Sequence, residues 1–302
     1  MTPSETAPDR LIEQALRERY FHSMPDGYLE TEWGKRDLEN HVTGRLSLDR
    51  TVVVPWLGRI LDLSGARILE IGCGTGSSTV ALAERGADIV ALDVDETSLA
   101  VARERCRHHE VHVRFVAANA AELPSAVSEE RFDLILFYAS LEHMTMDERL
   151  AAIRRTWEML PAGGLWSIID TPNRLWHFDF HTSLLPFFMW LPDELAFAYS
   201  KFSDRPRFND LYREPAPEAL LHFLRRGRGV SFHELELVMG RLQELQIAGW
   251  LDWEKETKSW LERLRNIASA DSRYRRFLRQ AAPSVHEAFL QPRLDVVIRK
   301  AG

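Results

Sequence analysis

A short segment in the first third of the chain combines residues that suit a nucleoside ligand. The stretch LEIGCGTGSST places Glu70, Gly72, Gly74 and Gly76 at the end of a predicted strand and directly before a predicted helix. Glycine accepts positive φ and lacks the Cβ that would keep a ligand from the backbone, and the first amides of the helix are free to donate. About 20 residues further on, Asp93 ends the stretch DIVALD, where a carboxylate can accept hydrogen bonds from both ribose hydroxyls. The glycines alone also fit an ordinary strand-to-helix turn, so the prediction of a nucleoside site depends on Asp93 as well.

The spacing of the glycines favours S-adenosylmethionine (SAM) over NAD. The dinucleotide fingerprint GxGxxG needs glycine or alanine where this chain has Ser77. A dinucleotide also places a pyrophosphate on the helix N-terminus, whereas the methionine part of SAM carries an ammonium group that the acidic Glu70 could meet. SAM is therefore the predicted cofactor, and a nicotinamide dehydrogenase is disfavoured.

Methyl transfer from a sulfonium is an in-line displacement, which needs alignment and exclusion of water more than acid catalysis. If the acceptor is a hydroxyl, a histidine with a pKa near neutrality is the natural base, and His143 follows the predicted strand 132–139 at its carboxyl end. The alternative is that Glu142 and His143 only position a loop. Asp170 ends the predicted strand 164–170 on the same edge of the sheet and could fix a hydroxyl or amine of the acceptor.

Beyond Asp170, His177, Asp179 and His181 recur at intervals of two residues and would face one way if the segment were extended. His177 and His181 join His143 and Asp170 as candidate catalytic residues. Two histidines and a carboxylate could also bind a metal, but the aromatic neighbours favour ordinary polar lining, and no metal is predicted.

The run SLLPFFMWLP, residues 183–192, is apolar but interrupted by proline, so it must be covered without forming one regular helix. Phe187, Phe188 and Trp190 are predicted to line a pocket for an apolar acceptor, with packing of the segment onto the core as the alternative. Tyr20, Tyr28 and Trp33 could add an N-terminal flap over the sulfonium. A basic stretch is either a solvated helix face or a clamp for a phosphate or carboxylate of the acceptor; it contains Arg273, Arg275, Arg276 and Arg279.

Alternation of strands and helices across the middle of the chain predicts a parallel sheet wrapped on both faces. The predicted elements are strand 66–71, helix 77–85, strand 88–93, helix 96–108, strand 112–118, strand 132–139, helix 146–160 and strand 164–170. The fold class is α/β: a Rossmann-like, seven-stranded, mostly parallel sheet with N-terminal helices and a largely helical lid. GVSFHELEL is predicted to be a strand, although Ser231 and Glu234 also fit a helix capping box. PRLDVVIRK is predicted to close the sheet at its edge.

The predicted organisation has six parts. They are an N-terminal helical flap (1–62), a SAM-binding core (63–172), an aromatic-rich lid insertion (173–215), a return to the core (216–239), a helical lid insertion (240–285) and a final edge strand (286–302).

The composition is that of an ordinary globular protein, with 302 residues, 45% hydrophobic and 27% charged. A net charge of -7 argues against general electrostatic binding to nucleic acid. The N-terminus lacks the order of a signal peptide, and no apolar run approaches the roughly 18 to 20 residues of a membrane span, so we expect a cytoplasmic protein. Cys73 and Cys106 are expected to be reduced thiols.

Five segments, taken together, resemble the successive motifs of class I SAM-dependent methyltransferases over about residues 66–172. They are ARILEIGCGTG, IVALDVD, AANAAELP, RFDLILFYASLEHM and LPAGGLWSIIDTPN. The LEHM and TPNR segments are most similar to the ubiquinone-biosynthesis and natural-product O-methyltransferases, whereas residues 173–290 resemble no family.

The resemblance implies a set of cofactor-binding residues. Gly72, Gly74 and Gly76 line the methionine, Asp93 binds ribose, Val94 packs on adenine, Asn119 and Ala120 face the adenine edge, and Tyr138 belongs to the same site. The family usually has an acidic residue where this chain has Asn119, whose amide can still donate to and accept from adenine.

These observations predict a SAM-dependent methyltransferase for a small, largely apolar acceptor, with a hydroxyl or carboxyl oxygen of a secondary metabolite or lipid-like compound as the methylated atom. Transfer to carbon or nitrogen is the nearest alternative, and a prenyl diphosphate would suit both the apolar and the basic features. A nucleic-acid methyltransferase would need a basic track and a base-flipping pocket. A non-catalytic SAM-binding protein is the remaining alternative, although the glycine turn and Asp93 show no loss of the site.

Overall fold

The computed structural model describes residues 7–205, 208, 210–213, 218–266 and 269–302. Its strands form a seven-stranded, mostly parallel sheet in the order β3-β2-β1-β4-β5-β7-β6. The predicted α/β Rossmann-like fold with N-terminal helices is confirmed. The chain divides into two units, Met1–Leu136 and Phe137–Gly302, and each is described by itself.

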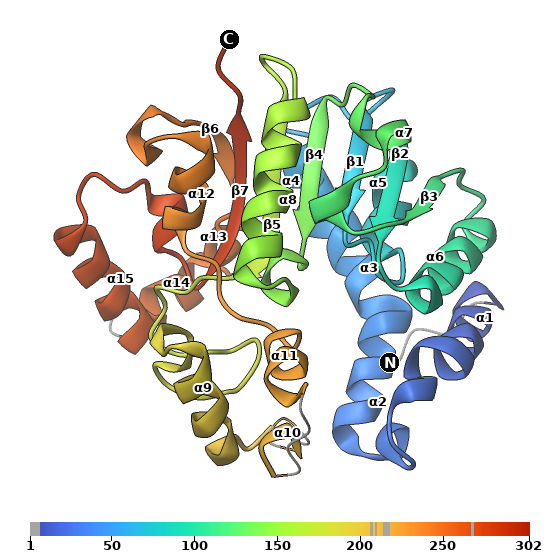
Figure 1. Cartoon of the computed structure of the whole chain (residues 1–302), viewed down its shortest axis with the longest axis horizontal. Coiled ribbons are helices and arrows are strands. Elements are labelled where there is room, and N and C mark those ends of the chain that lie inside the picture. Colours follow the sequence, from blue (N-terminus) through green and yellow to red (C-terminus); the bar gives the residue numbers. More distant parts are fainter. Residues whose placement is uncertain (1–6, 206–207, 209, 214–217, 267–268) are drawn as a thin grey trace. The chain divides into compact units, whose positions relative to one another are not determined.

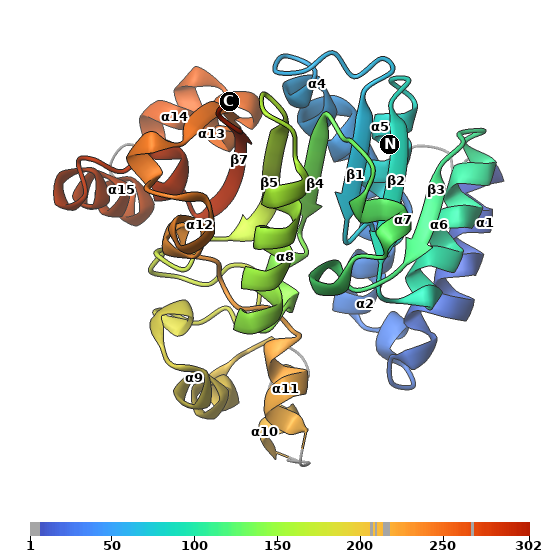
Figure 2. The same cartoon turned by 45° about the horizontal axis from the view of Figure 1, so that its top comes forward.

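The first unit contains the glycine turn between β1 and α5. β1 (Arg67–Ile71) pairs in parallel with β2 (Asp88–Asp93), and β2 pairs in parallel with β3 (Arg114–Ala117). Figure 2 shows these strands side by side, with α6 (Glu96–His108) next to β3. α5 (Ser77–Ala83) follows the glycines directly, and β2 and α6 have the predicted bounds.

The predicted N-terminal helix is confirmed as α1 (Ala7–Ala15), which continues as a π-helical turn over Leu16–Tyr20. Its apolar face is buried at Ile12 and Leu16, and α1 runs beside α6 (Figure 1). Three further α-helices follow in this part of the chain: α2 (Glu32–Glu39), α3 (Arg45–Leu48) and α4 (Val54–Leu57). The N-terminal segment therefore packs within the first unit through an apolar stripe.

In the second unit, β7 (Arg293–Arg299) lies between β5 (Leu165–Pro172) and β6 (Gln246–Trp250) and is antiparallel to both (Figure 1). The prediction that the last strand closes the sheet at its edge is wrong, because β6 has the outer position. Three consecutive residues of β7, Val296, Val297 and Ile298, are fully buried. Burial on both faces suits an interior strand better than an edge strand.

The predicted strand GVSFHELEL is a helix, α12 (Phe232–Met239), which packs against α8 (Met146–Met159). Both halves of its capping box are formed, because the Ser231 side chain accepts from the helix backbone and Glu234 accepts from Ser231 N. Those two hydrogen bonds satisfy amides that a helix start leaves open, and they decide between the two interpretations of the pattern.

Strand β6 instead falls inside the segment 240–285, which was predicted to be a helical lid insertion. The helices of that segment come after it and are α13 (Trp253–Thr257), α14 (Trp260–Asn266) and α15 (Ala270–Ala281). The sequence QIAGW has little β-branched content, and its pairing with β7 is irregular between Ile247 and Gly249.

The insertion after β5 contains α9 (Asp193–Tyr199) and α10 (Asp210–Arg213), and α11 (Ala219–Leu224) follows. An apolar cluster joins the insertion to α11 and contains Leu185, Phe188, Met189, Ala196, Phe208 and Phe223. The segment 216–239, which was predicted to return to the core, begins outside the described residues and contains α11.

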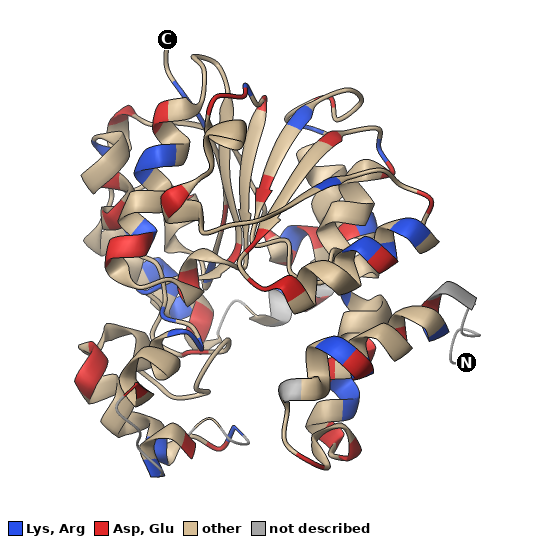
Figure 3. Cartoon of the chain, turned by 45° about the vertical axis from the view of Figure 1, so that its right-hand side comes forward, with Lys and Arg blue, Asp and Glu red and all other residues tan. Residues whose placement is uncertain are grey.

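The remaining elements include β4 (Leu134–Tyr138), which begins in the first unit and ends in the second, and α7 (Ser125–Ser128). Basic and acidic residues mix along the helices, while the strands carry few of either (Figure 3). Within the described residues, no helix combines the length and the apolar character that crossing a bilayer requires. Cys73 and Cys106 are both buried free thiols.

Candidate functional site

The glycine turn of the first unit holds three residues in the left-handed region, with φ of 76° at Gly72, 51° at Gly74 and 81° at Gly76. A Cβ on Gly76 would lie 2.9 Å from the Cβ of Ala102, whereas a Cβ on Gly74 would meet nothing within 4 Å. Gly76 is therefore needed for close packing of the turn on α6. Gly74 faces open space, where its backbone is accessible to a ligand.

Asp93 at the end of β2 is tied to this turn. Its Oδ2 accepts a hydrogen bond from Gly74 N at 2.8 Å, and its Oδ1 accepts one from Asp95 N at 2.9 Å. Burial raises the pKa of Asp93, and the two backbone hydrogen bonds oppose that rise. Val94 directly after it is 69% exposed, an apolar side chain left open beside a fixed carboxylate.

Glu70 was predicted to meet the ammonium group of the cofactor, but the structure gives it a different role. It is fully buried, and its two oxygens accept from the hydroxyls of Ser78 and of Thr79, the latter at 2.6 Å. Glu70 therefore fixes the first turn of α5 and presents no open carboxylate.

Ser77 lies between the glycines and the Glu70 partners. Its side-chain oxygen is buried and has no hydrogen-bond partner among the described residues. A buried hydroxyl without a partner is costly, so this atom is a candidate ligand contact. In the sequence analysis Ser77 served only as an argument against NAD and was not predicted to contact the cofactor.

Asn119 and Ala120 follow β3. The Asn119 Oδ1 accepts from Ala121 N at 2.9 Å and so caps a short 3-10 turn, Ala120–Glu122, which leaves its amide NH2 for other contacts. The side chain of Ala120 is buried. Tyr138, the last predicted cofactor residue, ends β4 in the second unit and is half-buried.

Arg105 of α6 was not predicted as a site residue, although it braces the glycine turn. The side chain is fully buried and donates to three carbonyl oxygens, those of Thr75 at 2.8 Å, Val42 at 3.0 Å and His41 at 2.6 Å. It thereby joins the glycine turn to the helices of the N-terminal segment. Charged residues are spread along α6, so nothing in the local sequence marks Arg105 as the buried one.

Of the predicted N-terminal flap, Tyr20 and Tyr28 are packed and Trp33 is 46% exposed. The Tyr20 ring lies 4.7 Å from the ring of His41, and the Tyr28 hydroxyl donates to Asp37 at 3.0 Å. Burial lowers the pKa of His41 to about 2, so this histidine is neutral.

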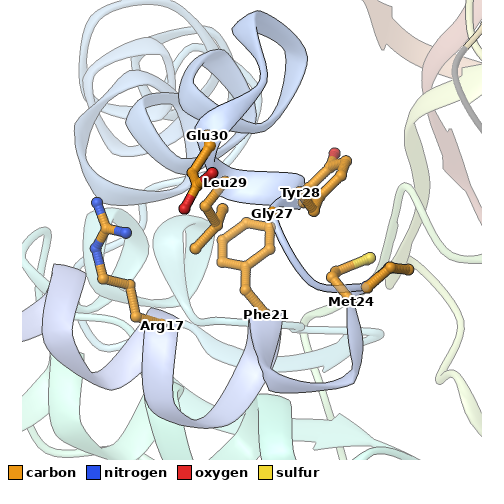
Figure 4. Close-up of a pocket in the computed structure, with 8 residues that line it drawn as sticks. Arg17, Phe21, Met24, Gly27, Tyr28, Leu29 and Glu30 are labelled. Atoms are coloured by element: carbon orange, nitrogen blue, oxygen red, sulfur yellow. The ribbon is translucent and has the colours of Figure 1, made fainter.

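A pocket of about 210 Å³ lies in the same N-terminal region (Figure 4). Phe21 and Leu29 lie side by side in it, with Arg17 and Glu30 toward one side and Met24 toward the other. Of the predicted residues, Tyr28 of the N-terminal flap lines it, and no residue of the glycine turn does. It is a hollow between N-terminal turns and not the glycine site.

His143 lies in a 3-10 turn, Leu141–His143, after β4. Its Nδ1 is 2.8 Å from the carbonyl oxygen of Arg225. Because a carbonyl only accepts, that contact assigns the proton to Nδ1 and leaves a lone pair on Nε2. The side chain is 43% exposed, so the lone pair is within reach of a ligand.

Glu142 of the same turn was not predicted as a catalytic residue, although its surroundings are unusual. It is fully buried, and its Oε1 lies 3.7 Å from His181 Nε2 and 4.0 Å from His143 Nε2. Oε1 has no hydrogen-bond partner among the described residues, whereas Oε2 accepts from Thr171 Oγ1 at 3.2 Å. Burial raises the pKa of Glu142 to about 7, and the nearby His181 opposes the rise. A glutamate in the short turn that follows the apolar strand was the available signal.

His177, Asp179 and His181 do not face one way, because the segment turns at Asp179. Its carboxylate accepts from the amides of His181 and Thr182, each at 2.9 Å, and also from Ser183 N at 2.5 Å. His181 is thereby directed to Glu142, while His177 Nε2 lies 3.2 Å from an oxygen of Asp271 in α15. In the described part of the chain, no three His, Cys, Asp or Glu side chains are arranged to hold a metal ion.

Asp170 has a left-handed φ of 53° within the irregular stretch of β5. Its amide donates to Asp295 Oδ1 at 2.8 Å, and its carboxylate accepts from Arg293 at 2.6 Å. Burial raises the pKa of Asp295 to about 6. The ion pair with Arg293 gives Asp170 a structural partner in the sheet.

The aromatic run divides into buried and exposed residues. Phe188 is fully buried in the apolar cluster of the insertion, whereas Phe187 and Trp190 are 51% and 45% exposed, with their ring centres 4.9 Å apart. Packing therefore accounts for Phe188, and the other two remain available at the surface.

In the basic stretch, Arg275 pairs with Glu254 at 3.2 Å and Arg279 with Glu287 at 2.7 Å.

The part of the chain that contains the glycine turn is similar to a known family. Residues 68–164 match the family model of a methyltransferase domain. The chain contains a class I SAM-dependent methyltransferase domain. The matched range begins in β1, includes the glycine turn, Asp93 and His143, and ends directly before β5. The predicted domain type is confirmed, and SAM is its cofactor.

Curated relatives match less than half of this chain. A ubiquinone biosynthesis O-methyltransferase of Pseudomonas fluorescens (strain Pf0-1) is 32% identical over 111 residues, which are 37% of this chain and 47% of that protein. One of Azorhizobium caulinodans is 37% identical over 134 residues, 43% of this chain and 51% of that protein. The chain thus spans about half the length of the curated relatives it matches.

Solved structures similar to this chain include a magnesium protoporphyrin IX methyltransferase from Synechocystis with bound SAM. It is 19% identical, with a TM-score of 0.40, and the match covers 57% of this chain and 80% of that one. A SAM-dependent methyltransferase from Clostridium acetobutylicum is 18% identical, with a TM-score of 0.38 and coverage of 47% and 58%.

Proposed function

We propose that this chain transfers a methyl group from SAM to a hydroxyl or carboxyl oxygen of a small, largely apolar molecule. The observation that carries the proposal is the glycine turn of the methyltransferase domain, held by Asp93 and left open at Gly74. SAM supplies an electrophilic methyl group on its sulfonium. The protein has to bind the cofactor, align the acceptor and take up the acceptor proton.

The first unit fits the cofactor at three points. The backbone at Gly74 is open to the methionine part, and the unpartnered Ser77 hydroxyl beside it can donate to the methionine carboxylate. Asp93 is fixed where a ribose can bind, and the exposed Val94 offers an apolar surface to adenine. Asn119 keeps a free amide NH2 for the adenine edge. Glu70 is left out of this set because both of its oxygens are occupied within the turn.

For an oxygen acceptor we assign the base to His143. Its Nε2 carries the lone pair in the tautomer that the Arg225 carbonyl selects. In the reaction the acceptor O–H bond breaks as the O–CH3 bond forms, His143 receives the proton, and the sulfur keeps the electron pair of the broken C–S bond. The name of the curated relatives supports oxygen as the methylated atom over the matched half of their length.

An apolar acceptor is supported by the insertion after β5. His181 of this insertion lies beside Glu142, next in sequence to the proposed base. The same insertion exposes Phe187 and Trp190 as a pair of aromatic rings. We propose that these rings, and not the buried Phe188, contact the acceptor.

The test begins with binding. SAM and S-adenosylhomocysteine should raise the melting temperature of the purified protein and NAD should not, because only a ligand of the native state shifts unfolding. Incubation with SAM carrying a 13C-labelled methyl group and a metabolite extract should then give a product heavier by one methylene. The 13C shift of that methyl group distinguishes oxygen from carbon or nitrogen. No binding of either adenosyl compound would overturn the proposal, and a labelled nucleic acid would contradict its acceptor class.

A further inference from the structure

One oxygen of the buried carboxyl group of Glu142 has no structural use that the fold explains, although the other accepts from Thr171. Its Oε1 lacks a hydrogen bond among the described residues, although the side chain is fully buried. An unpaired buried carboxylate is unfavourable, and most such groups in proteins are paired or neutral. The turn itself is already held by main-chain contacts, since the Glu142 carbonyl accepts from Arg228 N at 2.8 Å.

Two imidazole rings from different parts of the second unit approach the same oxygen. His143 comes from the turn after β4, and His181 comes from the insertion after β5. Their Nε2 atoms lie 4.0 Å and 3.7 Å from Oε1, and their ring centres are 6.1 Å apart. A proton on either ring would neutralise the carboxylate at a distance where opposite charges interact strongly.

We propose that Glu142 is the positioning residue that makes His143 a stronger base, and that His181 shares the same carboxylate oxygen. This inference rests on the proposed function. Before the reaction the three groups carry one negative charge in total, on a carboxylate removed from water. When His143 takes the proton from the acceptor, the total charge becomes zero, and burial favours that state. The proton then leaves through the exposed side of His143.

Other charges around Glu142 act in both directions. Arg149 of α8 favours the ionised carboxylate, while Asp170 of β5 disfavours it. Thr171 donates to the other oxygen. The pKa of Glu142, raised to about 7 by burial, agrees with a group that is close to its neutral state and gains from a nearby cation. His181 comes from the insertion after β5. The position of that insertion therefore affects the charge around the proposed base, His143.

The decisive experiment is NMR titration of the histidine ring protons in the wild type and in Glu142→Gln, without any substrate. Removal of the carboxylate should lower the titration midpoints of His143 and His181 by about one pH unit, as expected for loss of an opposite charge about 4 Å away. His108, paired with Glu104 in the first unit, is the internal reference and should not move. Unchanged midpoints for both His143 and His181 would overturn the inference.

His181→Gln is the second variant, and its half-exposed position makes misfolding a small concern. It should raise the midpoint of His143, because His143 then has the carboxylate to itself. A purely structural role for Glu142 predicts no such opposite shifts.

If the chain binds no SAM but the midpoints move as stated, the proposed function fails and the carboxylate–imidazole coupling stands. With turnover available, Glu142→Gln should lower kcat about tenfold with KM for SAM unchanged and move the pH profile toward acid.

Discussion

The glycine turn of the first unit and the Glu142 cluster of the second differ in the range of the contacts that hold their acidic residues. In the turn, Glu70 reaches Thr79 nine positions away and Asp93 reaches Gly74 nineteen positions away. In the second unit, polar contacts join residues 29 positions apart at Glu142–Thr171 and 123 apart at Asp170–Arg293. Short-range sites follow from a motif, whereas long-range sites depend on how loops return to the sheet.

Substitution of His143 should separate the two regions most clearly. His143→Ala should lower kcat by roughly 100-fold to 10,000-fold, because it removes the proposed base, while the Kd for SAM remains unchanged. Steady-state kinetics and calorimetry measure the two quantities. Equal loss of turnover and of SAM binding would show that the regions are not separable in this way.

Within the insertion, buried and exposed aromatic residues give the next largest contrast. Phe188→Ala should reduce the free energy of unfolding by about 3 to 5 kcal/mol, because it leaves a cavity in the cluster with Phe208 and Phe223. Phe187→Ala and Trp190→Ala are the matched controls and should lose far less stability while impairing use of the acceptor. Denaturant unfolding of the three variants tests this, and similar losses for all three would refute the division.

The pH dependence of stability should reveal the buried carboxylate. The pKa of Glu142 in the folded state, about 7, lies above its ordinary value of 4.5, so the folded protein holds this proton more tightly than the unfolded chain. Stability from this group is complete below pH 4.5 and is lost as the pH rises through 7. The wild type should lose about 3 kcal/mol over this range relative to Glu142→Gln. Urea unfolding of both proteins at pH 5 and pH 8 measures this. The assignment is wrong if the difference in unfolding free energy between the wild type and Glu142→Gln is the same at both pH values.

On the cofactor side, Asp93→Ala should weaken SAM binding by about 1 to 3 kcal/mol, since bound ribose hydroxyls would lose their acceptor. Histidine titration in the second unit should be unaffected. Isothermal calorimetry measures the affinity. An unchanged Kd would mean that the ribose binds elsewhere.

The smallest expected effect concerns two glycines of the same turn. Gly74→Ala should cost about 1 kcal/mol through its left-handed φ alone, and Gly76→Ala about 1 kcal/mol more, because its Cβ also meets Ala102 at 2.9 Å. Thermal unfolding of the pair measures the difference. Equal melting temperatures would show that the turn moves away from α6 easily.

Features held by contacts that are short-range in sequence were predicted well, and features held by long-range contacts were not. β2 and α6 have their predicted bounds because the apolar run of β2, the helical spacing of buried residues in α6 and the cap at Asp95 are all local. The glycine turn and Asp93 were found by spacing alone. By contrast, the contact between Glu142 and His181 depends on the turn that Asp179 makes, which an assumption of extended chain could not reveal.

The errors in the second unit have a common physical cause. In α12, an alternating pattern fitted two structures, and two side-chain hydrogen bonds decided between them. In β7, the residue types identified a strand, but its place between β5 and β6 depends on the pairing of a weak strand 43 residues earlier that was not expected. Composition predicts the type of an element better than its neighbours.

Arg105 has a consequence for the dynamics of the chain. Its guanidinium lies away from water and is satisfied by carbonyl groups of Thr75, Val42 and His41, so residues 41 and 42 cannot detach without leaving a buried cation short of acceptors. Local opening of that segment should therefore be as rare as opening of the glycine turn. Amide hydrogens on both sides of the guanidinium would then exchange with solvent as one cooperative unit, and a protease would find no early cleavage site between them.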